Sequence, residues 1–188
     1  KIMKRLFLPI KIKPEEKLLS LFNSFTSGFA NDKIKWVNIH NLHITLKFFG
    51  ETEENKITVI DNVILNTINL HQAFEFEISE CGVFGSSYQP KVIWLGIKNT
   101  DKLKQLTLNL LSEFEKAGFL TDRQNFVPHL TLGRINNVAD KKLFFEKIRK
   151  LNITDIQKVN VNEIILYESV LKREGPQYIE LKKYKLKD

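Results

Sequence analysis

Two short stretches of the chain share one residue pattern: His43-Ile44-Thr45-Leu46 and His129-Leu130-Thr131-Leu132. Side chains alternate between the two faces of a β-strand, so each stretch places its histidine and threonine on one face and its aliphatic residues on the other. The aliphatic face suits a hydrophobic core, which leaves the imidazole and hydroxyl groups to line a surface. The stretches lie almost half the chain length apart. If a pseudo-two-fold axis relates them, their polar faces meet across one cleft.

The remaining sequence alternates between helical and strand patterns. Helical spacing of apolar residues predicts helices over residues 14–28, 52–68, 101–118 and 140–151. Strand patterns cover residues 4–12, 35–37, 42–49, 74–79, 92–97, 130–132, 159–167 and 178–184. Several strands follow one another without a helix between them, which favours an α+β fold with largely antiparallel sheets. The length suits a single domain over residues 1–188, made of two lobes.

The composition excludes several classes of protein. With 43% hydrophobic and 27% charged residues the chain has a globular profile. Its apolar runs are too short to cross a bilayer, and residues 1–17 lack the apolar segment of a signal peptide, so we expect no membrane association. The single cysteine, Cys81, permits no intrachain disulfide and is expected to be a buried structural thiol. This usage fits a reducing compartment and predicts a cytoplasmic protein.

The net charge of +7 is concentrated at the two ends of the chain. Residues 1–17 carry six positive and two negative charges, residues 172–188 carry six and three, and the segment between them is neutral. A polyanion such as RNA would be drawn to such ends, although lysines also serve simply to keep a protein soluble. We therefore expect the ends, residues 182–187 included, to attract RNA and the segment that holds both motifs not to be strongly basic.

The paired motifs themselves suggest a chemistry. Imidazole is the side chain best suited to proton transfer near neutral pH, and a pair can divide the work into one acid and one base. Threonine hydroxyls can donate hydrogen bonds to an anion and stabilise the charge that develops on it. Such a site suits cleavage of a phosphodiester without a metal, since two histidines from distant strands are too few to hold one. The alternative is that each motif is only part of a structural strand.

The residues around both motifs extend the pattern into a resemblance to a known family. The segments that carry it are residues 5–8 (RLFL), 36–37 (WV), 41–50 (NLHITLKFFG), 84–85 (FG), 92–96 (VIWLG), 126–134 (FVPHLTLGR), 168–169 (ES) and 175–178 (GPQY). In this order they resemble the two-histidine (2H) phosphoesterases. Within that superfamily the chain is similar to the RNA 2′,3′-cyclic phosphodiesterases, also called 2′-5′ RNA ligases (the LigT-like group).

The resemblance implies a fold, an activity and a set of residue roles. The fold would be bilobal, with two antiparallel sheets facing a central cleft and helices outside. The activity would be hydrolysis of RNA 2′,3′-cyclic phosphate ends to 2′-phosphates, without a metal or any other cofactor, in a monomer whose partners are RNA or nucleotides with such ends. His43 would be the proton donor and His129 the proton acceptor. Thr45, Thr131 and Arg134 would bind the phosphate.

Several alternatives stay open on sequence grounds. The same cleft could instead serve a 2′-5′ RNA ligase or a 2′-5′ phosphodiesterase, and a third interpretation is an RNA-binding module without catalysis. Strand parity turns Arg134 away from His129 unless Gly133 permits a bulge. The same parity places Lys47 and Phe49 on the cleft face with His43 and leaves Phe48 in the core.

Overall fold

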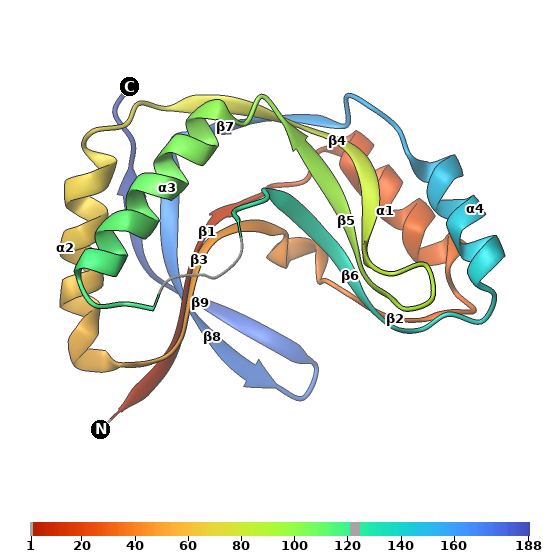
Figure 1. Ribbon diagram of the computed structural model, residues 1–188, viewed down its shortest axis with the longest axis horizontal. Coiled ribbons are helices and arrows are strands. Elements are labelled where there is room, and N and C mark those ends of the chain that lie inside the picture. The colour runs from red at the N-terminus through yellow and green to blue at the C-terminus, as the bar shows by residue number, and fades with distance from the viewer. Residues whose placement is uncertain (1, 121–124) are drawn as a thin grey trace.

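The computed structural model describes residues 2–120 and 125–188 and consists of two antiparallel β-sheets with helices on their outer faces (Figure 1). The first sheet has the strand order β3-β1-β8-β9 and the second has the order β2-β6-β5-β4-β7. The strands of the first sheet are β1 (Met3–Lys11), β3 (His43–Glu53), β8 (Glu163–Lys172) and β9 (Gly175–Lys185). The strands of the second are β2 (Lys33–Trp36), β4 (Phe74–Gly85), β5 (Pro90–Lys98), β6 (His129–Asn137) and β7 (Gln157–Val161).

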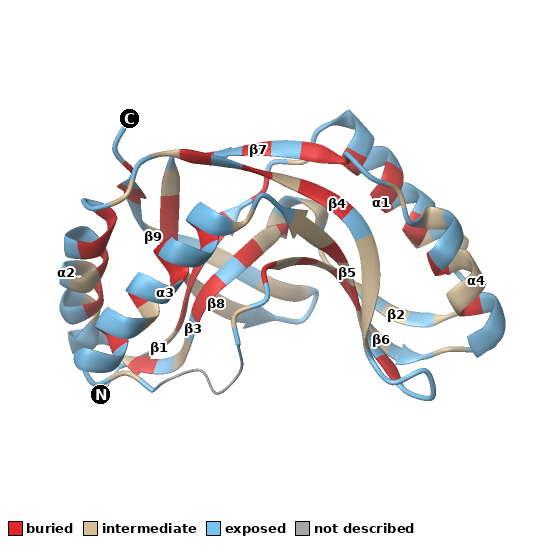
Figure 2. Ribbon diagram, turned by 45° about the horizontal axis from the view of Figure 1, so that its top comes forward, coloured by how far each residue is buried: buried red, intermediate tan, exposed pale blue. Residues whose placement is uncertain are grey.

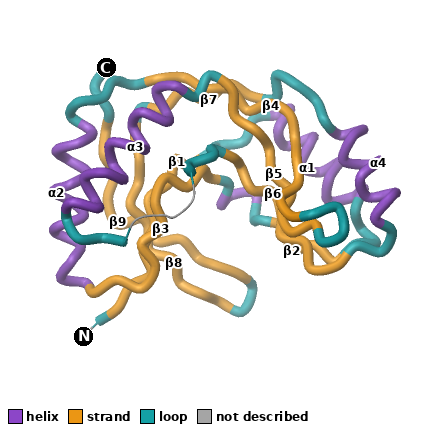
Figure 3. Tube along the Cα trace, viewed as in Figure 1, coloured by secondary structure: helices purple, strands orange, loops and turns teal. Residues whose placement is uncertain are grey.

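Two helices cover each sheet and complete a lobe (Figures 1 and 3). The first lobe is the four-stranded sheet with α2 (Ile57–Ile68) and α3 (Asp101–Lys116), and the second is the five-stranded sheet with α1 (Glu16–Gly28) and α4 (Lys141–Leu151). The lobes are not the two halves of the sequence. The helix after β1 covers the second lobe and the helix after β5 covers the first, whereas α2 and α4 stay with the lobe of the motif strand that precedes them. This reciprocal exchange fits the predicted pseudo-two-fold, bilobal α+β fold, which is confirmed.

Two predicted boundaries are wrong for a clear physical reason. Residues 159–167 form no single strand, because β7 ends at Val161 in one sheet and β8 begins at Glu163 in the other. The apolar run therefore spans a crossing between lobes. The helix predicted from residue 52 begins only at Ile57, after a short 3₁₀ turn, because Thr52 still pairs with β1 in the sheet.

Both motif strands contain a β-bulge at the same place in the pattern. In the β1–β3 ladder Leu8 faces Lys47 and Pro9 faces Thr45, so Leu46 is the extra residue. In the β5–β6 ladder Ile93 faces Gly133 and Trp94 faces Thr131, so Leu132 is the extra residue. In each strand the bulge follows the threonine and reverses the faces of the side chains that come next. A second register shift follows further along, where Phe49 is extra relative to β1 and Asn136 is extra relative to β2.

The hydrophobic core lies between the sheets and their helices. Each helix is buried along one face and exposed along the other (Figure 2). From the motif strands the core receives Ile44, Leu46, Leu130 and Leu132, each at most 3% exposed, as alternation predicts. Within residues 2–120 and 125–188 no helix is long and apolar enough to cross a membrane.

Candidate active site

A cavity of about 1100 Å³ separates the two lobes and is lined by both motif strands. It contains the five side chains that the sequence singled out, His43, Thr45, His129, Thr131 and Arg134. The first two come from β3 and the other three from β6, so the cavity joins motifs that lie far apart in the chain. The prediction that the polar faces of both strands meet across a cleft is therefore correct as geometry.

His43 sits half-buried at the start of β3. Its ring Nδ1 lies 2.7 Å from the carbonyl oxygen of Asn41, two residues earlier. The ring packs against Phe7 of β1, with centroids 5.2 Å apart, and Tyr178 of β9, at 5.4 Å, and these two rings also contact each other at 4.7 Å. The turn that carries Asn41 is fixed by Asn38, whose side chain accepts a hydrogen bond from the backbone N–H of His40. His43 is thus held by an aromatic cluster and at one ring nitrogen.

His129 repeats this arrangement on the second lobe. Its Nδ1 lies 2.8 Å from the carbonyl oxygen of Val127, again two residues earlier. Pro128 stands between them and restricts Val127 to an extended conformation, which aims that carbonyl. A single aromatic ring, Phe84 of β4, contacts the imidazole edge-on with centroids 4.9 Å apart.

These two hydrogen bonds define where each imidazole can exchange a proton. A backbone carbonyl can only accept a hydrogen bond, so the Nδ1 of each ring carries the hydrogen. In the neutral ring the lone pair is then on Nε2, and in the charged ring Nε2 carries the second proton. Both histidines therefore present Nε2 as the atom that takes up or releases a proton.

The surroundings of His43 favour its neutral form. Burial lowers the pKa of His43 below its usual value of about 6.5. The hydrogen bond to Asn41 opposes this shift, while the positive charges of His129 and Arg134 lower the pKa further. These charge effects act between the lobes, so residues of the second motif lower the proton affinity of His43.

Thr45 and Thr131 line the cavity on the same strand faces as their histidines, as alternation predicts. Arg134 joins them although simple parity turns it away, because the bulge at Leu132 reverses the later part of β6. The sequence prediction allowed for a bulge at Gly133, and the structure places the extra residue one position earlier. An ideal Cβ at Gly133 would lie 2.8 Å from the side chains of Ile34 and Trp36, so a side chain at this position would collide with β2.

The matching bulge in β3 overturns the sequence predictions for three residues. Phe48, expected in the core, is 46% exposed and lines the cavity, with the Arg5 guanidinium 5.2 Å from its ring centroid. Phe49, expected on the cleft face, instead packs edge-on against Phe114 and Phe119. Lys47 is only 4% exposed, and its Nζ donates a hydrogen bond to the Leu120 carbonyl oxygen at 2.7 Å. Strand parity fails here because one inserted residue exchanges the two faces.

The charge of the cavity also differs from the expectation. Its described lining contains Arg5, Lys35, Arg134 and Lys172 but a single carboxylate, Glu174. The site is therefore basic. Arg5 and Lys172 do belong to the basic ends of the chain, which form walls of the cavity.

The lysines near the C-terminus lie elsewhere. Lys182 forms an ion pair with Asp61 of α2 at 2.6 Å, and Lys183 lies 3.8 Å from Glu163. Neither residue lines the cavity. These lysines therefore take no part in the lining of the site, and the expectation that residues 182–187 attract RNA stays a prediction.

Sequence reasoning missed the residues that support the histidines. Trp94 faces Thr131 across the β5–β6 ladder, and its indole packs on Gly82 and against Phe84, the ring that contacts His129. Only a residue without a side chain fits at Gly82, because an added Cβ would collide with the indole. The sequence pattern ended this strand at residue 79, whereas β4 continues to Gly85, so Gly82 was not recognised as a strand glycine, the kind that often marks a close approach.

The donor atoms at the site are imidazole nitrogens and hydroxyl oxygens. Across the described part of the chain no group of three or more His, Cys, Asp or Glu side chains converges in a way that would hold a metal ion. Cys81 lies outside the cavity, and burial raises the pKa of its thiol to about 11, as fits a structural cysteine.

Comparison with known proteins identifies the family. A family model described as the 2′-5′ RNA ligase superfamily matches residues 15–173, which is most of the chain. The chain belongs to the 2′-5′ RNA ligase superfamily. A protein of Methanothermobacter thermautotrophicus named RNA 2′,3′-cyclic phosphodiesterase is 36% identical over 157 residues, covering 84% of this chain and 85% of the relative. A protein of the same name from Methanocaldococcus jannaschii is 33% identical and covers 96% and 99%.

Solved structures in the comparison share the fold of this superfamily member. A crystal structure of a Thermus thermophilus protein matches with a TM-score of 0.78 at 22% identity, over 97% of each chain. Escherichia coli LigT in complex with 3′-AMP matches with a TM-score of 0.76 at 24% identity, over the full length of both chains. These likenesses confirm the fold.

Proposed function

We propose that this protein hydrolyses the 2′,3′-cyclic phosphate ends of RNA to 2′-phosphates, with the two motif histidines as an acid–base pair. The proposal rests on one observation: two imidazoles, each with its Nδ1 bound to a backbone carbonyl, line one cavity between the lobes. The names of the relatives at 33–36% identity support the same activity.

In the proposed reaction a water molecule attacks the phosphorus atom of the cyclic phosphate. His129 Nε2 accepts a proton from this water as the new P–O bond forms. The bond between phosphorus and the 3′-oxygen breaks, and His43 Nε2 donates a proton to that oxygen. The product keeps the 2′-phosphate and gains a 3′-hydroxyl, and the two histidines have exchanged protonation states. Proton transfer of this kind contributes about 10²- to 10⁴-fold to the rate.

The remaining site residues act on the phosphate itself. Thr45 and Thr131 approach from opposite lobes and donate hydrogen bonds to the non-bridging oxygens. Arg134 neutralises the charge that grows on these oxygens as water attacks, with a guanidinium that suits planar, two-point contact with phosphate. None of these steps requires a metal ion.

The lowered pKa of His43 is compatible with its role as proton donor. In the empty site the nearby positive charges disfavour a second proton on this ring. A bound phosphodiester carries a negative charge between the histidines and Arg134, and this charge offsets them. Bound substrate therefore favours the protonated form of His43, which is the form that acts as the acid. The low pKa of the ring then makes it easy for His43 to release this proton.

The direct test is to incubate the protein with a 2′,3′-cyclic nucleotide in EDTA and to identify the product by ³¹P NMR. The proposal predicts a 2′-phosphate as the only product. Formation of a 3′-phosphate would contradict the assignment of the leaving oxygen, and a requirement for added metal would contradict the mechanism.

The family description also names a 2′-5′ linkage, so a second activity calls for the same kind of assay. A site that opens the cyclic phosphate with water can also open it with the 5′-hydroxyl of another RNA end, which forms a 2′-5′ bond. By microscopic reversibility the same site can cleave a 2′-5′ bond, with the neighbouring 3′-hydroxyl as the attacking group. Parallel incubation with 2′-5′-linked and 3′-5′-linked dinucleotides discriminates this activity. A protein that binds RNA but changes none of these substrates would instead be a binding module.

A further inference from the structure

The cavity continues beyond the motif residues along a protruding β-hairpin. Strand β8 pairs with β1 only at Tyr167 and Glu168, whereas its pairing with β9 continues to Lys172 and Gly175. The hairpin therefore extends past the sheet as two strands without a third, and it projects from the first lobe in Figures 1 and 3. We call residues 169–178 the arm. Most of its residues line the cavity, and Asn41 Nδ2 ties it to the His43 turn by a 3.2 Å hydrogen bond to the Pro176 carbonyl oxygen.

The cavity offers more space than a single nucleotide fills. Its volume of about 1100 Å³ exceeds the 300–1,000 Å³ that is typical of pockets for a drug-sized ligand, and a nucleotide is a ligand of that size. Space therefore remains between the arm and the opposite lobe once one nucleotide occupies the motif residues.

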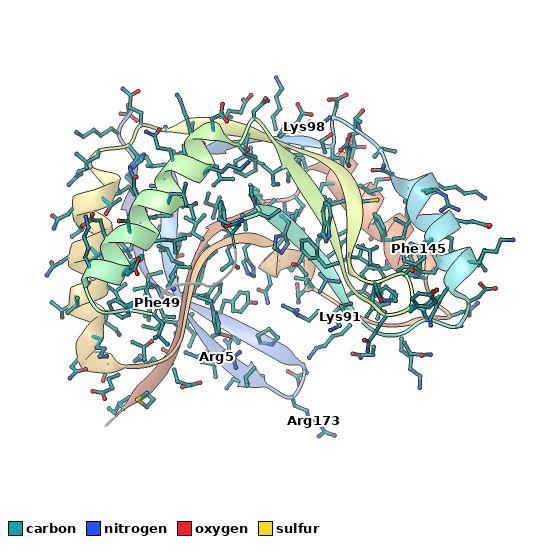
Figure 4. The ribbon with its side chains drawn as sticks, in the orientation of Figure 1. Arg5, Phe49, Lys91, Lys98, Phe145 and Arg173 are labelled. Carbon is teal, nitrogen blue, oxygen red and sulfur yellow. The ribbon has the colours of Figure 1, made fainter. Side chains whose placement is uncertain are left out.

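The cations around this space exceed the need of one phosphate. Lys172 lines the cavity from the arm, and Arg173 lies at the arm's tip (Figure 4). Lys35 of β2 lines the opposite wall and faces Arg134 directly across the β2–β6 ladder. Like charges at directly opposed positions destabilise a sheet, so this pair costs stability unless an anion lies between them.

The charges of the cavity are also unpaired, in contrast to other lysines of the chain. Among the described residues no carboxylate lies within ion-pair distance of Arg5, Lys35 or Lys172, whereas Lys182 and Lys183 have such partners. Arg5 reaches into the region between β1 and the arm, where it lies over Phe48 (Figure 4). Cations without a carboxylate partner, contributed by both lobes to one cavity, match a chain of phosphates.

We propose that Lys35 and the arm residue Lys172 bind the ribose–phosphate backbone upstream of the cyclic end, which makes single-stranded RNA ends better substrates than cyclic mononucleotides. This inference rests on the proposed function, because it assumes that the cyclic end occupies the motif residues. It assigns a role to two residues that the acid–base mechanism does not use.

The test compares two variants that each lose two positive charges. Lys35→Ala/Lys172→Ala removes one cation from each wall, and Lys141→Ala/Lys142→Ala removes two exposed lysines from α4, which lie outside the cavity. The probe is a short, fluorescently labelled oligoribonucleotide ending in a 2′-phosphate, with binding followed by anisotropy from low to high salt. Each phosphate contact to a single strand contributes about 0.7 to the slope of log K against log salt concentration. Loss of two contacts in the first variant should therefore reduce the magnitude of this slope by about 1.4. The second should leave it unchanged.

Turnover gives an independent readout. The ratio of kcat/KM for an oligoribonucleotide with a cyclic end to kcat/KM for a cyclic mononucleotide should fall about five- to tenfold in Lys35→Ala/Lys172→Ala at low salt, and should stay at the wild-type value in the control. Equal salt slopes and equal ratios in the two variants would overturn the inference. Failure of the wild-type protein to hydrolyse either substrate would instead overturn the proposed function, and the anisotropy series would still decide whether the arm binds RNA.

Discussion

The two motif strands share a backbone design but differ in what surrounds it. β3 and β6 each carry a histidine bonded through Nδ1 to the carbonyl two residues earlier, and each inserts a bulge directly after the threonine. The residue two positions beyond the bulge lines the cavity in both strands, but it is Phe48 in one and Arg134 in the other. His43 contacts two aromatic rings, whereas His129 contacts one, Phe84, among the described residues.

This difference shows how a symmetric scaffold can hold an asymmetric reaction. The shared features fix the two Nε2 atoms and the two hydroxyl groups, which a phosphodiester needs on both sides. The features that the strands do not share make the two sides of the site different. Burial favours the neutral form of His43, and Arg134 brings a permanent positive charge to the second lobe.

The largest effect should come from the histidines. Replacing either His43 or His129 with alanine removes one of the two proton transfers and should lower kcat/KM for a cyclic mononucleotide by about 10²- to 10⁴-fold. His71→Gln is the matched control, since His71 contacts Asn109 outside the cavity. Full activity in either alanine variant would break the equivalence of the two motifs.

Gly82→Ala should damage the second lobe alone. The added methyl group collides with the Trp94 indole and so displaces Phe84, the ring that supports His129. Overpacking of this kind costs about 1–3 kcal/mol, and we expect a lower melting temperature together with a lower kcat. Gly28→Ala is the control, because nothing lies within 4 Å of its Cβ position. A Gly82→Ala protein with normal stability and normal kcat would show that this packing does not position His129.

Phe48 and Phe49 should respond in opposite ways if the bulge in β3 assigns their faces. Phe49→Ala removes a ring packed on Phe114 and Phe119 and should lower the free energy of unfolding by about 3 kcal/mol. Phe48→Ala should leave stability within about 0.5 kcal/mol, as for a surface substitution. It should instead raise KM, because a stacked base contributes roughly 1–3 kcal/mol to binding. Denaturant unfolding and steady-state kinetics on both variants measure these two effects. A stability loss in Phe48→Ala together with a raised KM in Phe49→Ala would refute the assignment of faces.

The smallest effect concerns coupling between the lobes. Arg134 lowers the pKa of His43, so Arg134→Ala should raise that pKa, and so should binding of inorganic phosphate to the wild-type protein. Both changes shift the protonation of His43 toward higher pH, since a lost positive charge and a gained negative charge each favour the charged imidazole. An NMR titration of the His43 ring measures the shift. An unchanged or lower pKa in the variant would show that the lobes do not influence each other.

The sequence was enough to predict the fold and the five central residues, but not the orientation of the side chains that follow the bulges. Alternation placed His43, Thr45, His129 and Thr131 correctly because all four precede the bulges. It failed at Phe48 and Phe49, because a bulge is a property of the pairing between two strands and leaves little trace in one. The cavity cations Lys35 and Lys172 stayed hidden for a similar reason, since each belongs to a wall that forms only when the lobes meet.

The division of labour between the two histidines is the central claim, and a substrate with sulfur in place of the bridging 3′-oxygen tests it most directly. A thiolate leaves without being protonated, so this cyclic phosphorothiolate makes the general acid unnecessary but still requires the base. If His43 is the acid and His129 the base, His43→Ala should regain most of the wild-type rate on the sulfur substrate while His129→Ala stays inactive. Rescue of His129→Ala instead would reverse the two roles, and rescue of neither variant would contradict the acid–base pair.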